Sequence, residues 1–205
     1  MSTTAVYLPG DEPYLGRESV LTFDLTIPRA LEIHAEIGRR TFGAAQTPLQ
    51  QAAAALIPQG VSIALSIREL IRQAYLYSAA ILLRPLVERT GMVQFFTMND
   101  EAVVAWHSGW PRASQPSFHQ LVKLVMPKAS EEEHDLTGQI LHKLVHADPK
   151  GSVFNIFERE DGSLAFSSGK DLHQPKKADA VSVLACHCLR RLTATSVYVF
   201  GHEQT

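Results

Sequence analysis

The sequence has few cysteines, and this scarcity excludes a fold held together by disulfides. Cys186 and Cys188 are the two cysteines among the 205 residues. One residue separates them, a spacing at which they rarely bond to each other. On a helix, side chains two residues apart point about 160° from each other, so the two thiols do not meet at one metal ion. We therefore expect both to be buried, small apolar side chains.

An excess of charge of one sign is also missing. The 19 basic and 21 acidic residues leave a net charge of −2 at pH 7, so the whole chain lacks the basic surface typical of nucleic-acid-binding proteins. Residues 1–16 contain no basic stretch followed by an apolar one, as a secretory signal would. No run of about 18 apolar residues lacks a charge, so no membrane span or membrane partner is expected. A cytoplasmic location is the resulting expectation.

Motifs for phosphate-binding loops, dinucleotide binding and serine nucleophile elbows are absent, so we expect no cofactor. What the chain does have is apolar residues, 45% of the total, enough for one sizeable core. The turn-forming residues Pro9–Pro13 place a flexible arm over residues 1–20, and a single helical domain follows over residues 21–205. Asp161-Gly162 between apolar segments predicts a small β-hairpin in residues 151–170.

Helix signals occur along most of this domain. Pro28 stands at a plausible first helical position, which predicts a helix to about Thr41. Thr47-Pro48-Leu49-Gln50 carries a capping box, and Pro58 and Gly60 are expected to interrupt the helix that follows. Further helices are predicted at Asn99–Trp106, Ser117–Val125, Ser130–His146 and Lys177–Val199. The expected fold class is all-α, a bundle of about five to seven helices with a small β-hairpin inserted before the last helix.

Two charged residues, Arg84 and Glu88, lie inside an almost continuous apolar run from Val61 to Phe96. Burying an unpaired charge costs several kcal/mol. Their spacing of four places them on one face of a helix, where they can pair. Pro85 between them predicts a kink, or two helices that meet at Arg84.

Three interpretations of this pair remain open. At about 100° per residue, Tyr77 and Phe95 share its helix face. The pair is then a structural ion pair that fixes the helix register, a functional site in which Arg84 meets an anion such as a phosphate, or an exposed pair at the surface.

Two histidines, His142 and His146, form a second constellation. They lie four residues apart on the predicted helix 130–146, opposite its apolar face. They are therefore expected to face solvent, a partner or a cleft. Histidines at this spacing can bind a metal, but Lys143 stands where a His-Glu-x-x-His metalloprotease needs its glutamate. The nearest candidates for a third ligand are His134 and Asp148, and we expect no metal site here.

Residues 60–150 carry a resemblance to a known group. Leu-Leu-Arg-Pro-Leu-Val-Glu (Leu82 to Glu88), followed by Leu-Val-His-Ala-Asp-Pro (Leu144 to Pro149), resembles a bacterial group of uncharacterised all-helical proteins similar to HEPN domains. The resemblance implies an HEPN-like bundle that forms a homodimer. It also implies one of two functions. The first is a non-catalytic module of a defence or regulatory system that binds a protein partner or a nucleotide. The second is a metal-independent ribonuclease, a toxin or phage-defence effector that acts on RNA.

The catalytic proteins of the HEPN group use an Arg-x4-6-His motif at the dimer interface. Arg29 with His34, and Arg112 with His119, fit the spacing, although an alanine follows each arginine where that group usually has a polar residue. Because neither match has the polar residue after its arginine, the sequence favours the non-catalytic module.

A different set of residues would carry any chemistry. We expect Arg84, Glu88 and His146 to converge across helices. Arg84 would then stabilise phosphate charge, and His146 would act as the general acid or base.

Overall fold

The computed structural model describes residues 12–146, 156–158, 161–166 and 169–201. Helices dominate this part of the chain, so the predicted all-α class is confirmed. The α-helices are α1 (Glu18–Thr41), α2 (Pro48–Arg72), α3 (Leu76–Thr97), α4 (Asp100–His107), α5 (Phe118–Val125), α6 (Glu131–Val145) and α8 (Pro175–Gly201). A 3-10 turn, η2 (Arg112–Ser114), lies between α4 and α5.

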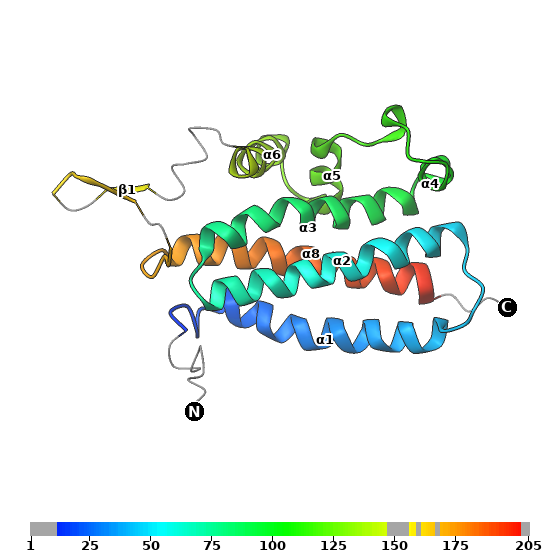
Figure 1. Ribbon diagram of the computed structural model, residues 1–205, viewed down its shortest axis with the longest axis horizontal. Coiled ribbons are helices and arrows are strands. Elements are labelled where there is room, and N and C mark those ends of the chain that lie inside the picture. Colours follow the sequence, from blue (N-terminus) through cyan, green and yellow to red (C-terminus); the bar gives the residue numbers. More distant parts are fainter. Residues whose placement is uncertain (1–11, 147–155, 159–160, 167–168, 202–205) are drawn as a thin grey trace, which may run out of the picture.

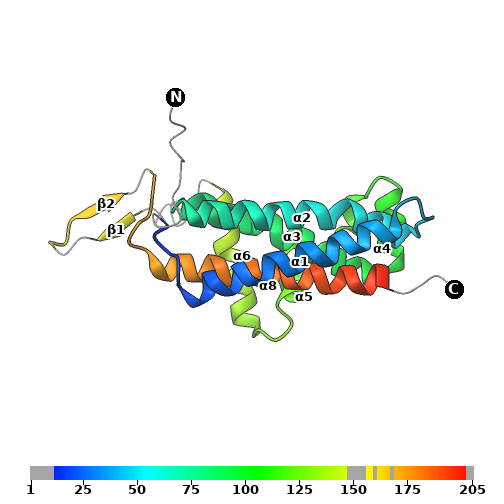
Figure 2. The ribbon, with the colours of Figure 1, turned by 90° about the horizontal axis from the view of Figure 1, so that it is seen from below.

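The four long helices α1, α2, α3 and α8 run side by side (Figures 1 and 2). α2, α3 and α8 pack on one another, and α1 covers α8. The short helices α5 and α6 pack on α3, on the side away from α1. Side chains from all four long helices fill the core, and the largest fully buried ones include Phe23, Ile67, Phe96 and Leu192. α3 therefore lies between the main core and the α5–α6 layer.

The start of the first helix differs from the prediction. α1 begins at Glu18, and Pro28 lies inside it. The apolar residues Val20 and Phe23 precede the proline and are buried against the bundle, and this burial offsets the hydrogen bond that proline cannot donate. The predicted arm, residues 1–20, therefore includes the first residues of α1. It also includes the buried Tyr14, whose hydroxyl donates to the Asp171 carbonyl. Residues 1–11 lie outside the described part.

The predicted interruption at Pro58 and Gly60 is also wrong, because α2 continues through both residues to Arg72. Gly60 lies close to α8: a Cβ there would be 2.6 Å from Cδ1 of Leu192, at the far end of that side chain. A residue without a side chain therefore lets α2 and α8 approach closely.

The break in the long apolar run falls before Arg84. α2 ends at Arg72, α3 starts at Leu76, and α3 then includes Pro85. The helix end is a Schellman motif, in which the Tyr75 N–H donates to the Leu70 carbonyl at 2.8 Å. Ala74 takes the left-handed position of this motif, with φ of 63°, where glycine is usual. The two helices therefore meet at residues 73–75. The prediction that two helices meet at Arg84 is wrong, and the alternative, a kink at Pro85, stays a prediction.

α4, α5 and α6 start where the sequence predicted, and each start has a side-chain cap. The Asn99 side chain accepts from the Ala102 N–H, and Ser117 and Ser130 each form a capping box. α8 starts two residues before its predicted first residue. In the insertion, β1 (Ile156–Glu158) pairs antiparallel with β2 (Leu164–Phe166). The rest of residues 151–170 lies mostly outside the described part, so a complete hairpin there remains a prediction.

One described helix, α2, is long and apolar enough to cross a membrane by length and composition, with 33% of the tested stretch buried. This is weak evidence for a span, because core helices of soluble proteins have the same length and composition. α2 packs against both α3 and α8, as a core helix does. A cytoplasmic location remains a prediction.

The two cysteines are free and buried in α8, as the sequence predicted. Burial raises the pKa of the Cys188 thiol to about 12. Since the thiolate is the reactive form, we expect Cys188 in the folded protein to resist alkylation by iodoacetamide at neutral pH and to react fully in denaturant. Mass spectrometry of the digested protein measures both states. Rapid labelling of Cys188 without unfolding would contradict this burial.

Candidate functional site

Arg84 and Glu88 pair on α3, as their spacing predicted. Arg84 Nε donates to Glu88 Oε1 at 3.1 Å. The side chains are 20% and 33% exposed, so the pair is partly buried at the boundary between the core and the surface. Glu88 Oε2 also lies 3.4 Å from Arg89 Nη1. The Glu88 carboxylate thus pairs with two guanidinium groups, so the three side chains together carry a net positive charge.

The Arg84 guanidinium also reaches beyond its own helix. Nη1 lies 3.0 Å from His142 Nδ1 of α6, and Cζ lies 4.8 Å from the centre of the Phe118 ring of α5. A guanidinium has donors only, so His142 Nδ1 accepts in this hydrogen bond. The Phe118 contact has the geometry of a cation–π interaction. Arg84 therefore lies where α3, α5 and α6 meet.

His146 lies beyond His142, and in the described part of the chain it contacts the His142 ring and not Arg84 itself. It follows the last residue of α6, and its ring centre lies 4.2 Å from that of His142, with 47° between the ring planes. The Tyr77 hydroxyl of α3 donates to the Leu144 carbonyl at 3.4 Å and ties this end of α6 to α3. We call Arg84, Glu88, His142 and His146 the α3–α6 cluster.

The structure therefore brings the three residues of the predicted set near one another, with His142 between Arg84 and His146. Of the three residues expected to converge, Arg84 and Glu88 touch each other, and His146 is linked to them through His142. Sequence reasoning singled out His142 only as one half of a histidine pair. The sequence did indicate that His142 lies on the same side of the helix as His146, because both histidines share the face opposite the apolar one. The missing information was how α6 crosses α3.

The two Arg-x4-6-His matches lie in different settings. Arg29 is exposed on α1 and pairs with Glu32 at 3.5 Å. His34 is half-buried, burial lowers its pKa, and its Nε2 lies 3.4 Å from Thr193 Oγ1. Arg112 lies in η2, while His119 on α5 contacts carboxylates of α6. Among the described contacts, neither arginine touches the histidine of its own match.

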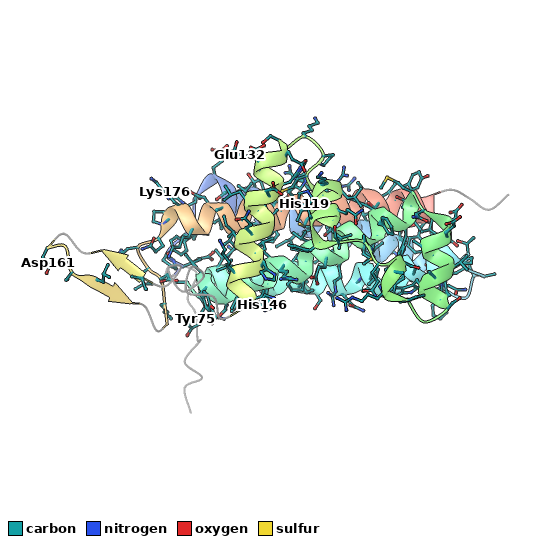
Figure 3. All side chains as sticks on the ribbon, turned by 90° about the horizontal axis from the view of Figure 1, so that it is seen from above. Tyr75, His119, Glu132, His146, Asp161 and Lys176 are labelled. Carbon is teal, nitrogen blue, oxygen red and sulfur yellow. The ribbon has the colours of Figure 1, made fainter. Side chains whose placement is uncertain are left out.

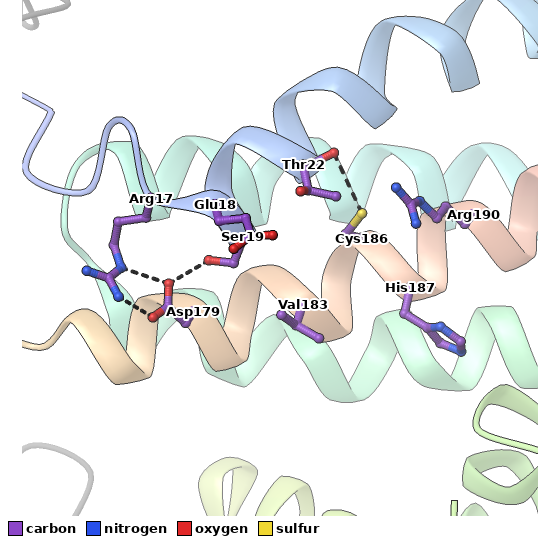
Figure 4. A pocket seen from close by; sticks show the side chains of 9 residues that line it. All are labelled: Arg17, Glu18, Ser19, Thr22, Asp179, Val183, Cys186, His187 and Arg190. Carbon is purple, nitrogen blue, oxygen red and sulfur yellow. Dashed lines mark hydrogen bonds and ion pairs between the residues drawn. The ribbon is translucent and has the colours of Figure 1, made fainter. Parts of the chain in front are cut away.

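A pocket of about 500 Å³ lies between the start of α1 and the first half of α8 (Figure 4). Arg17 Nε donates to Asp179 Oδ1 at 2.7 Å, and Ser19 Oγ donates to the same oxygen at 2.6 Å. The hydrogen bonds from Arg17 hold the pKa of Asp179 below its usual range. Because these polar groups satisfy one another, we interpret them as a structural tie between α1 and α8.

The α3–α6 cluster differs from this tie in its surroundings. It joins a cation that is always charged to two exposed imidazoles, side chains that can each accept or donate a hydrogen bond. Such a set can bind an anion and can transfer protons to or from it. Comparisons of the chain with protein-family models, curated proteins and solved structures found no match.

Proposed function

We propose that this protein is a non-catalytic helical module that binds a nucleotide through its phosphates at the α3–α6 cluster. The observation that supports the proposal is the Arg84 guanidinium, fixed between Glu88, His142 and Phe118 while 20% of its side chain remains exposed. A fixed guanidinium suits phosphate, because its planar donors match two phosphate oxygens and little side-chain freedom is lost on binding. The HEPN-like relationship, the homodimer and a role in a bacterial defence or regulatory system belong to this proposal.

The change that tests binding is Arg84→Gln. We expect it to weaken ATP binding about tenfold or more, since a hydrogen bond to a charged group contributes about 1.5–3 kcal/mol. Titration calorimetry with ATP measures the affinity of both proteins.

The matched control is Arg89→Gln, which removes a neighbouring positive charge that also pairs with Glu88. This variant should retain most of the wild-type affinity. Equal affinities of Arg84→Gln and wild type would refute phosphate binding at the cluster.

A second candidate function is a metal-independent ribonuclease, and the 4.2 Å spacing of the two imidazoles favours it. When the 2′-hydroxyl of RNA attacks the neighbouring phosphate, cleavage needs a base that takes the hydroxyl proton and an acid that protonates the leaving oxygen. Two adjacent histidines can divide these roles, and Arg84 can stabilise the charge that develops on the phosphate.

RNA cleavage in the presence of EDTA decides between the candidates. Cleavage by the wild type that is lost in a folded His142→Ala/His146→Ala variant would replace the binding module with the nuclease. Intact RNA together with ATP binding that depends on Arg84 would favour the binding module.

A further inference from the structure

A second group of chemically active side chains gathers where α5 and the first turns of α6 meet. His119 Nε2 lies 3.1 Å from Glu131 Oε1, and His119 Nδ1 lies 3.3 Å from Asp135 Oδ1. One ligand atom from each of the three residues falls within 4.8 Å of the others. This spacing matches a set of ligands around one metal ion. Such a group also occurs on surfaces without a metal, so a further observation is needed.

That observation is the buried His134. Its residue is 6% exposed, and its Nε2 lies 2.8 Å from the Met126 carbonyl. A carbonyl only accepts, so Nε2 carries a proton, and in the neutral ring the lone pair is on Nδ1. Nδ1 is buried without a hydrogen-bond partner, and it lies 3.7 Å from Glu131 Oε2. In the neutral ring this lone pair and the carboxylate repel, so the arrangement favours a cation between them, which is either a metal ion or a proton on Nδ1.

We propose that His119, Glu131, His134 and Asp135 form a binding site for a divalent transition-metal ion of the zinc class. Two imidazole nitrogens and two carboxylates are a ligand set that zinc accepts. The backbone carbonyl that holds His134 Nε2 is the usual outer partner of a metal-binding histidine, since it fixes the tautomer and the ring orientation. The sequence analysis named His134 only as a candidate third ligand beside His142 and His146, because the approach of His119 to α6 depends on how α5 packs there.

Lys123 explains how the site remains stable without a metal. Its Nζ lies 2.7 Å from Glu131 Oε1, where it neutralises part of the acidic charge. The lysine is exposed and has a long flexible stem, so it can move away when a metal takes this oxygen. Binding must displace this ion pair, so removal of the lysine charge should strengthen metal binding.

The position of the site suggests a structural role. Figure 3 shows Glu132 and His146 near opposite ends of α6, and His119 on α5 beside the Glu132 end. A metal bound by α5 and α6 would fix the start of the helix whose other end carries His142 and His146. This inference is independent of the proposed nucleotide binding, because it concerns other residues and is measured with the metal alone.

Titration calorimetry with Zn²⁺ tests the site on the full chain after EDTA treatment and dialysis. We expect saturable binding and a higher melting temperature with Zn²⁺. Asp135→Asn and His119→Gln should each weaken binding about tenfold or more, as the loss of metal-supporting groups does. Both positions lie on the surface side of the site, so these variants should fold. Lys123→Met should bind Zn²⁺ more tightly than the wild type.

Two matched controls locate the site. Glu132→Gln removes an exposed carboxylate from the same helix turn, and His142→Gln/His146→Gln removes the other histidine pair. Both should bind Zn²⁺ like the wild type. The proposal is refuted if Zn²⁺ does not bind, if Asp135→Asn and His119→Gln bind as tightly as the wild type, or if only the His142/His146 variant loses binding. It is also refuted if NMR shows His134 doubly protonated in the presence of Zn²⁺.

Discussion

Arg68→Met is expected to lower the free energy of unfolding by about 3–5 kcal/mol, the usual result of removing one partner from a buried charge group. Arg68 of α2 pairs with Asp24 of α1 through two bonds, one of them 2.8 Å from Nη2 to Oδ2, and it also pairs with Glu12. The side chains of Arg68 and Glu12 are 11% and 7% exposed. Without the guanidinium, the Glu12 carboxylate would lose its ion pair in a poorly solvated position, and Asp24, which is 32% exposed, would also lose its ion pair. Urea denaturation followed by circular dichroism measures the loss.

The control is Arg39→Met on α1, which removes a guanidinium that pairs with Glu36 at 2.7 Å on the exposed surface. Surface ion pairs contribute about 0–1 kcal/mol, so this change should have a small effect. Arg68→Met/Asp24→Asn should recover part of the lost stability, because it removes one of the unpaired charges. Similar effects of Arg68→Met and Arg39→Met would mean that Arg68 is not buried as described.

Features that depend on a few neighbouring residues could be predicted from the sequence. The caps at Asn99, Ser117 and Ser130 place a side chain and the N–H that it binds within one turn of chain. The Arg84–Glu88 pair is a contact of the same kind, since one helical turn joins the two residues.

Features that depend on distant parts of the chain could not be predicted in this way. The α2–α3 break lies at Ala74, which is neither glycine nor proline, and the Asp171 N–H donates to the Ala74 carbonyl from far along the chain. The Arg68 group was missed for a similar reason. Its partner Glu12 lies in a segment with turn residues and no helical period, so nothing local links it to α2.

The candidate site likewise combines a contact within one helix, which the sequence predicts, and a contact between helices, which it does not. The positions of Arg84 and Glu88 on one face follow from helix geometry. The contact between Arg84 and His142 requires that α6 crosses α3 beside Arg84. α5 packs on both α3 and α6 and so helps to set this crossing point. A pattern of apolar residues identifies which helix face is buried, but not which neighbour covers it.

Gly91→Ala should lower the free energy of unfolding by about 1–3 kcal/mol, the typical cost of overpacking a close contact. A Cβ at Gly91 of α3 would lie 2.8 Å from Leu121 Cβ, 2.9 Å from Leu121 O and 3.0 Å from Leu121 Cα of α5. Two of these atoms belong to the backbone, so no change of rotamer relieves the clash, and α5 must move. This movement would shift Phe118 away from Arg84 and, under the proposed function, should weaken ATP binding. Urea denaturation and titration calorimetry measure the two effects.

Two other helical glycines provide the comparison that identifies the cause. Gly138 of α6 has open space around its missing Cβ, so Gly138→Ala should stabilise the protein by up to about 1 kcal/mol through helix propensity. Gly60→Ala meets the far end of the Leu192 side chain, which can yield, so its effect should lie between the other two. This order separates a backbone clash from the loss of glycine itself. If Gly91→Ala were as stable as Gly138→Ala, α5 would lie further from α3 than described, and its hold on both Phe118 and His119 would be weaker. If Gly91→Ala were less stable but bound ATP normally, the position of Phe118 would not matter for the ligand, and Arg84 would act without it.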